Sequence, residues 1–314
     1  MSLVVVLAIF VKIHTVFGAA GEFGYSGSNG PDNWHGACAL GNEQSPIDLK
    51  PQAADIICAI PALDLSDYQQ ETVSKLTIKN TGTSVVIETP GKDIKIKDGG
   101  LLNEYKLAQF HFHWADADNK GSEHTVDGKW YAMEMHFVHA KSGAADLDEA
   151  LRMRDGLAVL GVFFEVGSEE HPGVKKLADQ LAQVAAAGTT SSVDLPSSVK
   201  LSDLLPSDTS SFYRYQGSLT TPKCNENVMW TVFSTTVKIS AAQMEAFRGI
   251  KDTDGATMKN YRPTQPLNNR RLILRQNSCP VRESRNIEDD QCPTVSACEG
   301  GTTTVATNGA SSHR

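Results

Sequence analysis

Short runs in which polar and apolar residues alternate follow one another along the chain from Thr72 onward. Turn residues such as Gly82 and the pair Pro90-Gly91 separate these runs, which span residues 73–78, 85–89 and 93–97. A period of two places the apolar side chains on one face, so the pattern predicts antiparallel strands with one wet face. Longer apolar runs predict inner strands of the same sheet over residues 106–114, 129–140 and 157–166.

Two helices are predicted beside these strands. The first begins at Pro172, and its apolar face consists of Val174, Leu177, Leu181 and Val184. The second spans residues 241–248, behind a capping box formed by Ser240 and Gln243.

No internal repeat or interdomain linker interrupts this pattern. We therefore expect a single α+β domain, predominantly β, over residues 21–276. Its core is expected to be a large, twisted, mostly antiparallel central sheet that carries a few short surface helices.

The two ends of the chain fall outside this pattern. An apolar run at the N-terminus leads to small residues at positions 18–20, which predicts a secretory signal peptide over residues 1–18. A first strand or a membrane anchor is the alternative, but the run is shorter than the about 20 residues that span a bilayer. Residues 277–314 are polar, contain cysteines and are predicted to form a disordered tail. We expect a secreted, extracellular protein with no membrane span.

Composition narrows the range of partners. The 314 residues carry a formal net charge of -8, and no block of Lys or Arg occurs. This balance argues against nucleic acid or an anionic membrane as the partner and leaves a small neutral or anionic substrate. Six cysteines, an even number, indicate disulfides in an exported chain, although spacing alone leaves every pairing open.

Histidines supply the first chemical pattern. In residues 109–114, the strand period of two puts Gln109, His111 and His113 on one face. In residues 132–138, the same period puts Glu134 and His136 on one face. If the two strands pair antiparallel, three neutral imidazoles converge, and three histidines with one open position is the catalytic zinc arrangement.

Gln109 and Glu134 strengthen this interpretation. Each lies two residues from a histidine on the same face, where it can accept the second ring proton and hold the imidazole in one tautomer. A His-x-His pair by itself is more often a pair of satisfied sheet histidines. With Gln109, Glu134 and His136 added, the metal site becomes the favoured interpretation.

Longer motifs in a fixed order make the pattern specific. They are Gln109-Phe-His-Phe-His-Trp114, Gly121-Ser-Glu-His-Thr-Val-Asp127, Glu134-Met-His-Phe-Val-His139 and Ser218-Leu-Thr-Thr-Pro222. With these motifs, residues 23–275 resemble an α-class carbonic anhydrase of the extracellular type. The resemblance implies reversible hydration of carbon dioxide to bicarbonate and a proton, in a cleft on the sheet.

The resemblance also implies the cofactor and the catalytic residues. His111, His113 and His136 are expected to bind Zn²⁺, with a zinc-bound hydroxide as the nucleophile. Thr220 is expected to accept the hydrogen bond of that hydroxide and to donate its own proton to Glu123. Without the resemblance, the segment around Thr220 is an ordinary turn.

An apolar wall for carbon dioxide is implied by the same resemblance. The matching residues are Val138, Val159, Leu219, Thr221, Val228 and Trp230. Each of them could equally be an ordinary core residue, because no spacing distinguishes the two roles. His124 and His139 lie in matched motifs but are expected to be structural.

Two further positions are informative by comparison with the family. The fastest members carry a proton-relay histidine where this chain has Thr83, and a hydroxyl cannot titrate near neutrality. We therefore expect buffer-dependent proton transfer. Cys38 and Cys224 match a disulfide of extracellular members, whereas Cys58, Cys279, Cys292 and Cys298 have no assigned partners.

Two alternatives remain at this stage. A non-catalytic extracellular matrix or binding protein could keep the fold, although such relatives typically lose a zinc-binding histidine. A zinc hydrolase acting on an ester is the other. The acidic balance and the polar tail are compatible with biomineralization, and pH regulation is an equally compatible role.

Overall fold

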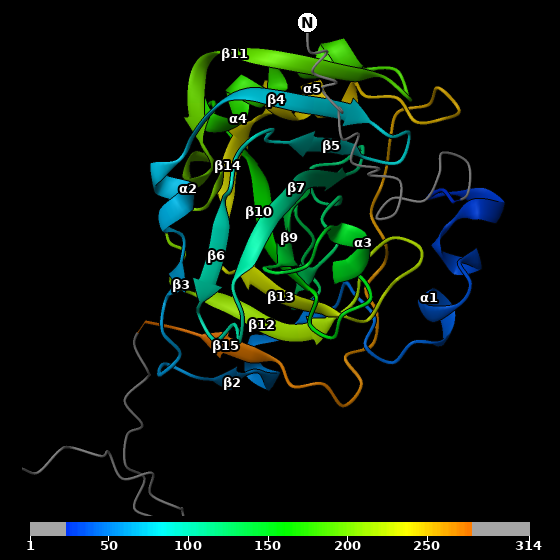
Figure 1. Ribbon diagram of the computed structural model, residues 1–314. Coiled ribbons are helices and arrows are strands. Elements are labelled where there is room, and N and C mark those ends of the chain that lie inside the picture. The colour runs from blue at the N-terminus through cyan, green and yellow to red at the C-terminus, as the bar shows by residue number, and fades with distance from the viewer. Residues whose placement is uncertain (1–22, 278–314) are drawn as a thin grey trace, which may run out of the picture. The chain divides into compact units, whose positions relative to one another are not determined.

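A thirteen-stranded sheet organises the part of the protein that the computed structural model describes, residues 23–277 (Figure 1). The strand order along the main path is β11-β4-β5-β7-β9-β10-β13-β12-β15-β2, and most neighbouring strands run antiparallel. Parallel pairs join β10 to β13 and β14, and β15 to β2. The expected α+β fold with a mostly antiparallel sheet is confirmed.

The strands have the following bounds. Before the centre of the sheet come β1 (Asp48–Leu49), β2 (Asp55–Ile56), β3 (Leu63–Asp64), β4 (Thr72–Asn80), β5 (Val85–Glu88) and β6 (Lys95–Asp98). The centre consists of β7 (Tyr105–Trp114), β9 (Met133–Lys141) and β10 (Leu157–Gly167), and the short β8 (Thr125–Val126) pairs with β1. The remaining strands are β11 (Thr190–Lys200), β12 (Phe212–Gly217), β13 (Val228–Phe233), β14 (Val237–Ser240) and β15 (Ile273–Arg275).

Helices are few and short. They are α1 (Ala37–Leu40), α2 (Ser66–Gln70), α3 (Leu147–Ala150), α4 (Pro172–Ala178) and α5 (Ala241–Arg248). Tight 3-10 turns are η2 (Gly27–Asn29), η3 (Pro31–Asn33), η4 (Pro51–Ala53), η5 (Leu181–Val184) and η6 (Leu201–Leu204). The capping box predicted for α5 is present, because Ser240 and Gln243 exchange side-chain to backbone hydrogen bonds.

Two predicted elements differ from the observed ones. The strand expected over residues 129–140 begins only at Met133, because Lys129 bridges to Val126 and Tyr131 accepts a backbone hydrogen bond from Ser122. Those contacts hold residues 129–132 against the preceding loop. The helix expected from Pro172 ends at Ala178, and η5 carries the remaining apolar residues into the same core.

The register of the central strands decides which side chains share a face. His111 lies opposite His136, His136 opposite Gly161, and Gly161 opposite Val232. Since side chains alternate along a strand, the phenylalanines that flank these histidines point to the other face. Each face carries its own apolar core, one containing Phe110, Phe112 and Phe137, the other Val138, Val159 and Trp230.

A disulfide ties the N-terminal segment to a loop before β13. Cys38 and Cys224 are bonded, and Cys58 is also disulfide-bonded. The amide of Cys224 donates to the carbonyl of Thr221, so the bond anchors the loop that carries Thr220. On the chain-entropy model, closing so long a loop contributes about 4 to 5 kcal/mol to stability.

Some predictions concern residues outside the described range. These are the signal peptide over residues 1–18, the polar tail from residue 278 onward, and the three cysteines of that tail. Among residues 23–277, no helix is long and apolar enough to cross a membrane.

One histidine of the core is neutral and fully buried. His139 Nδ1 donates to the carbonyl of Ala158 (3.1 Å), and its Nε2 lies 2.7 Å from the hydroxyl of Tyr68, which donates to it. Burial lowers the pKa of His139 to about 4. Both ring nitrogens of His139 are therefore occupied by hydrogen bonds within the core.

This burial makes a testable contribution to acid sensitivity. Between the unfolded pKa of 6.5 and the folded value of about 4, the unfolded chain binds the extra proton, so stability should fall as pH falls through that window. In His139→Gln, the free energy of unfolding should fall by about 3 kcal/mol less than in the wild type across this pH window. The measurement is urea unfolding at several pH values. The exposed control His35→Gln should keep the wild-type slope; an unchanged slope in His139→Gln contradicts the assignment.

Candidate metal centre and active site

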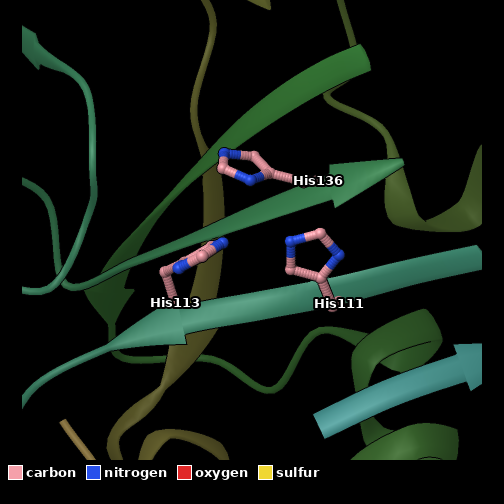
Figure 2. A group of neighbouring side chains, drawn as sticks. All are labelled: His111, His113 and His136. Atoms are coloured by element: carbon pink, nitrogen blue, oxygen red, sulfur yellow. The ribbon is translucent and has the colours of Figure 1, made fainter. Parts of the chain in front are cut away.

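Three imidazoles converge from two neighbouring strands. His111 and His113 project from β7 and His136 from β9, and Figure 2 shows their rings pointing toward one another. Ring centroids lie 4.9 Å apart for His111 and His113, 5.3 Å for His111 and His136, and 4.5 Å for His113 and His136. One nitrogen from each ring lies within 4.8 Å of the others, so the three histidines could hold a metal ion.

The opposite nitrogen of each ring is engaged by a hydrogen-bond acceptor. His111 Nδ1 donates to Gln109 Oε1 (2.9 Å), His136 Nε2 donates to Glu134 Oε1 (2.7 Å), and His113 Nδ1 donates to the carbonyl of Asn260 (2.7 Å). These bonds fix the tautomers, because the donating nitrogen must carry the proton. The lone pairs of the three rings are thereby directed away from these acceptors.

The donor set fits a zinc ion. His113 Nε2 is buried and has no hydrogen-bond partner within the described residues, which is costly for a polar atom unless a ligand completes it. Burial, together with the neighbouring imidazoles, lowers the pKa of His111 and His113 well below the ordinary value, and burial also lowers that of His136. Neutral imidazole is the form that binds metal, and a three-histidine set is a known catalytic zinc arrangement.

Glu134 organises the residues behind His136. Its Oε1 also accepts from His124 Nδ1 (2.7 Å), while Oε2 accepts the backbone amides of Glu123 and His124 (both 2.8 Å). Burial by itself would raise the pKa of Glu134, but the two histidines and their hydrogen bonds outweigh it and hold the pKa well below the usual range. An ionised carboxylate therefore braces His136.

His124 is consequently structural in these contacts. Its second nitrogen lies 2.6 Å from the hydroxyl of Tyr215, whose ring is stacked on Trp230. His124, Glu134 and His136 also lie close enough to form a metal-binding group. Since Glu134 already accepts four hydrogen bonds, we assign that group to the support of His136.

Thr220 and Glu123 meet beside the three histidines. Burial raises the pKa of Glu123 well above its ordinary value, while hydrogen bonds from the Thr220 hydroxyl and the Arg262 amide act in the opposite direction. The Arg262 amide donates to Glu123 Oε1 at 2.8 Å. The side chains that the sequence paired as catalytic are thus in hydrogen-bond contact.

A small apolar cavity opens against the histidines. It encloses about 10 Å³ and is lined by His111, His136, Val138, Val159, Leu219, Thr220, Thr221 and Trp230. Of the expected wall residues, Val228 is fully buried in the same core but does not line the cavity. So narrow and apolar a space suits a small uncharged molecule rather than a bulky one.

Asn260 was not identified from the sequence, yet it joins three parts of the site. Its side chain donates to the carbonyls of Thr83 (3.1 Å) and Phe112 (2.8 Å) and accepts the amide of Trp114 (2.8 Å). Its own carbonyl is the acceptor for His113. Thr83, at the expected relay position, is nearly buried, and its hydroxyl lies 3.2 Å from that of Thr81.

Arg262 was not identified from the sequence either, and its role is visible only in the structure. Its guanidinium donates to Gln44 Oε1 (2.9 Å), the carbonyl of Ser45 (2.7 Å) and the carbonyl of Cys38 (2.7 Å). The residue therefore links Glu123 to the segment that carries the disulfide.

Comparison with known proteins finds similar sequences over most of the chain. The family model described as eukaryotic-type carbonic anhydrase matches residues 29–276. Carbonic anhydrase 4 of Rattus norvegicus is 39% identical over 251 residues, which cover 78% of this chain and 79% of that protein. Carbonic anhydrase 1 of Mus musculus is 35% identical over 260 residues, or 80% of this chain and 97% of that protein.

Asn260 offers a test of the support behind His113. Asn260→Ala removes the side-chain hydrogen bonds that place its carbonyl, so zinc affinity should fall by about 10- to 100-fold. The measurement is a zinc titration against a competing chelator, with the exposed Asn119→Ala as control. Equal affinity in the two variants would show that the Asn260 side chain does not position the ligand.

Proposed function

Since the chain belongs to the eukaryotic-type carbonic anhydrase family, we propose that it hydrates carbon dioxide reversibly at a zinc ion held by His111, His113 and His136. One observation carries the proposal: three buried neutral imidazoles converge while the opposite nitrogen of each donates to a fixed acceptor. The relatives are named carbonic anhydrases, so the chain is a carbonate dehydratase by family.

A zinc ion held by His111, His113 and His136 would supply a Lewis acid, and carbonic anhydrase is the known case in which zinc lowers the pKa of bound water to about 7. Gln109, Glu134 and the Asn260 carbonyl hold the ring protons on the far side of the ligands, which keeps the three lone pairs aimed at one point. Because β7 and β9 are already ordered in the folded protein, the entropy cost of bringing the three histidines together is met during folding and not during metal binding.

Thr220 orients the nucleophile. Because its hydroxyl proton is donated to Glu123, the Thr220 oxygen is left to accept a hydrogen bond from a nucleophile in the cavity. Glu123 is in turn held by the Arg262 amide. Val138, Val159 and Trp230 exclude competing water and offer carbon dioxide an apolar contact surface.

The proton released by hydration must still leave the cavity. If zinc-bound water has a pKa of about 7, and a proton recombines with the site at no more than about 10¹⁰ M⁻¹s⁻¹, then proton release without buffer limits turnover to roughly 10³ s⁻¹. Thr83 cannot relay that proton near neutrality. We infer that added buffer carries it and that turnover is limited by this step.

A non-catalytic binding protein with the same fold is the second candidate, and the complete set of three histidines disfavours it. Secretion is supported by the Cys38–Cys224 disulfide, since disulfides persist in oxidising compartments. An ester could also be hydrolysed by the same centre as a side reaction. Among residues 23–277, no feature of the structure favours a role in mineral deposition over a role in pH regulation.

His111→Ala tests the metal assignment. It removes one ligand, so bound zinc and carbon dioxide hydration should be lost together, with activity falling at least about 100-fold. Metal content and stopped-flow hydration are measured on the same preparations, with the exposed His35→Ala as control. Full hydration activity without zinc, or zinc binding without any hydration in the wild type, would refute the proposal, the latter favouring the binding protein.

Thr83→His tests the proton-transfer proposal. Wild-type turnover should rise steeply with imidazole-type buffer, and the new imidazole should raise the rate at low buffer by about tenfold or more. Thr81→His, in the same loop, serves as the matched control. A wild-type turnover near 10⁶ s⁻¹ that does not depend on buffer would overturn the proposal. That turnover, the rate of the fastest carbonic anhydrases, is about a thousandfold above the limit for proton release without buffer.

A further inference from the structure

A second cleft lies apart from the three histidines and includes residues of the sheet strands β12, β13 and β15. It has a volume of about 820 Å³, and part of its wall consists of Gly100, Arg214, Gln216, Met229 and Ile273. We call this space, with those wall residues, the arginine cleft. Residues lining the histidine cavity and the arginine cleft do not overlap.

The register places the side chains of Arg214 and Gln216 on the face of the sheet opposite the three histidines. His136 lies opposite Gly161, Gly161 opposite Val232, and Val232 opposite Tyr213, so Tyr213 shares the face of the histidines. Its neighbour Arg214 must then point to the other face. Gln216, two residues on, points the same way.

The cross-strand partners of Arg214 and Gln216 also line the arginine cleft. Ile273 of β15 lies opposite Arg214, and Met229 of β13 lies opposite Gln216. Paired residues share a face, so the four side chains form one patch across three strands. The patch belongs to the regular sheet and is not a feature of one loop.

Arg214 is a buried cation without an anionic partner. Its side chain is 4% exposed, and its Nε donates to the hydroxyl of Thr231 (3.1 Å). Its Nη2 is buried with no hydrogen-bond partner, and no carboxylate among residues 23–277 lies within 4.0 Å of the guanidinium. The ring of Phe212 lies 5.2 Å from the guanidinium carbon, and the hydroxyl of Tyr105 also interacts with the charge. An isolated buried charge is strongly unfavourable unless a counter-ion is bound.

The other charged groups of the cleft are mostly positive. Arg270 and Arg271 also line it, against one carboxylate, Glu43. Arg270 donates to the carbonyls of Gln216, Gln44 and Leu267, which carry no formal charge, whereas Arg271 pairs with Asp55. Side-chain amides of Asn42, Asn268 and Asn269 add neutral donors to the wall.

We propose that the arginine cleft is an anion-binding site in which Arg214 binds a small oxyanion of the phosphate or carboxylate class. The planar guanidinium offers parallel N–H donors that match two oxygens of either class. The bound oxyanion supplies the counter-charge that no carboxylate among residues 23–277 provides. The site is independent of the metal centre and does not rest on the proposed catalytic function.

The test is isothermal titration of the full chain with inorganic phosphate and, in a second arm, with acetate, at pH 7 and constant ionic strength. Saturable binding is expected for at least one anion, and the tighter one identifies the class. Arg214→Met should weaken it by about tenfold or more, since hydrogen bonds to charged groups are the strong ones. The exposed control Arg154→Met should bind as the wild type does.

Two further variants separate the outcomes. Gln216→Glu keeps Arg214 and adds a negative charge to the cleft, so it should weaken binding about fivefold or more even if Arg214→Met is poorly folded. Its control is the exposed Gln69→Glu. His111→Ala disables the metal centre and should still bind the anion. Loss of binding in His111→Ala with retention in the Arg214 and Gln216 variants would place the anion at the metal centre and overturn the proposal, as would no saturable binding of either anion.

Discussion

The pairing of β7 with β9 in a single register is the constraint on which the site depends. His111 stands directly opposite His136, and His113 opposite Glu134, so a slip of β7 by one residue would turn His111 and His113 away from His136 into the opposite core. The phenylalanines between the histidines resist such a slip, because they are fully buried on the other face. Packing of one core thus positions the chemistry on the other.

Burial then determines what the histidines can do. A buried imidazole stays neutral, and a neutral imidazole whose one nitrogen donates to a fixed acceptor presents the other as a lone pair. Gln109 and Glu134 provide two of these acceptors from the strands themselves, whereas Asn260 provides the third from a distant segment. The buried, apolar surroundings also fit the cavity to a small uncharged molecule, such as the carbon dioxide that we propose as substrate.

The buried charge of Arg214 has far fewer partners than the buried charge of Glu134. Around Glu134, every oxygen is met by donors, and the charge is retained because it is hydrogen-bonded. Arg214 is also buried, but it has one hydroxyl partner and no carboxylate partner among residues 23–277. The contrast within one sheet is the physical reason to assign a ligand to the arginine cleft, since protein groups satisfy the first charge and not the second.

Local periodicity in the sequence determined the faces of β7 and β9, the candidate ligands, their partners Gln109 and Glu134, and the capped helix α5. Alternation and capping act over two to four residues, so they can be seen in the sequence. Tertiary structure alone decided that the Asn260 carbonyl accepts from His113, 147 positions away, that Arg262 braces Glu123, and that Arg214 lacks an anion. It also decided that β11 is a strand. This segment contains Ser and Pro, which have little preference for strands, and it forms a strand because it pairs with β4. These features depend on contacts between segments remote in sequence, and no local pattern encodes such contacts.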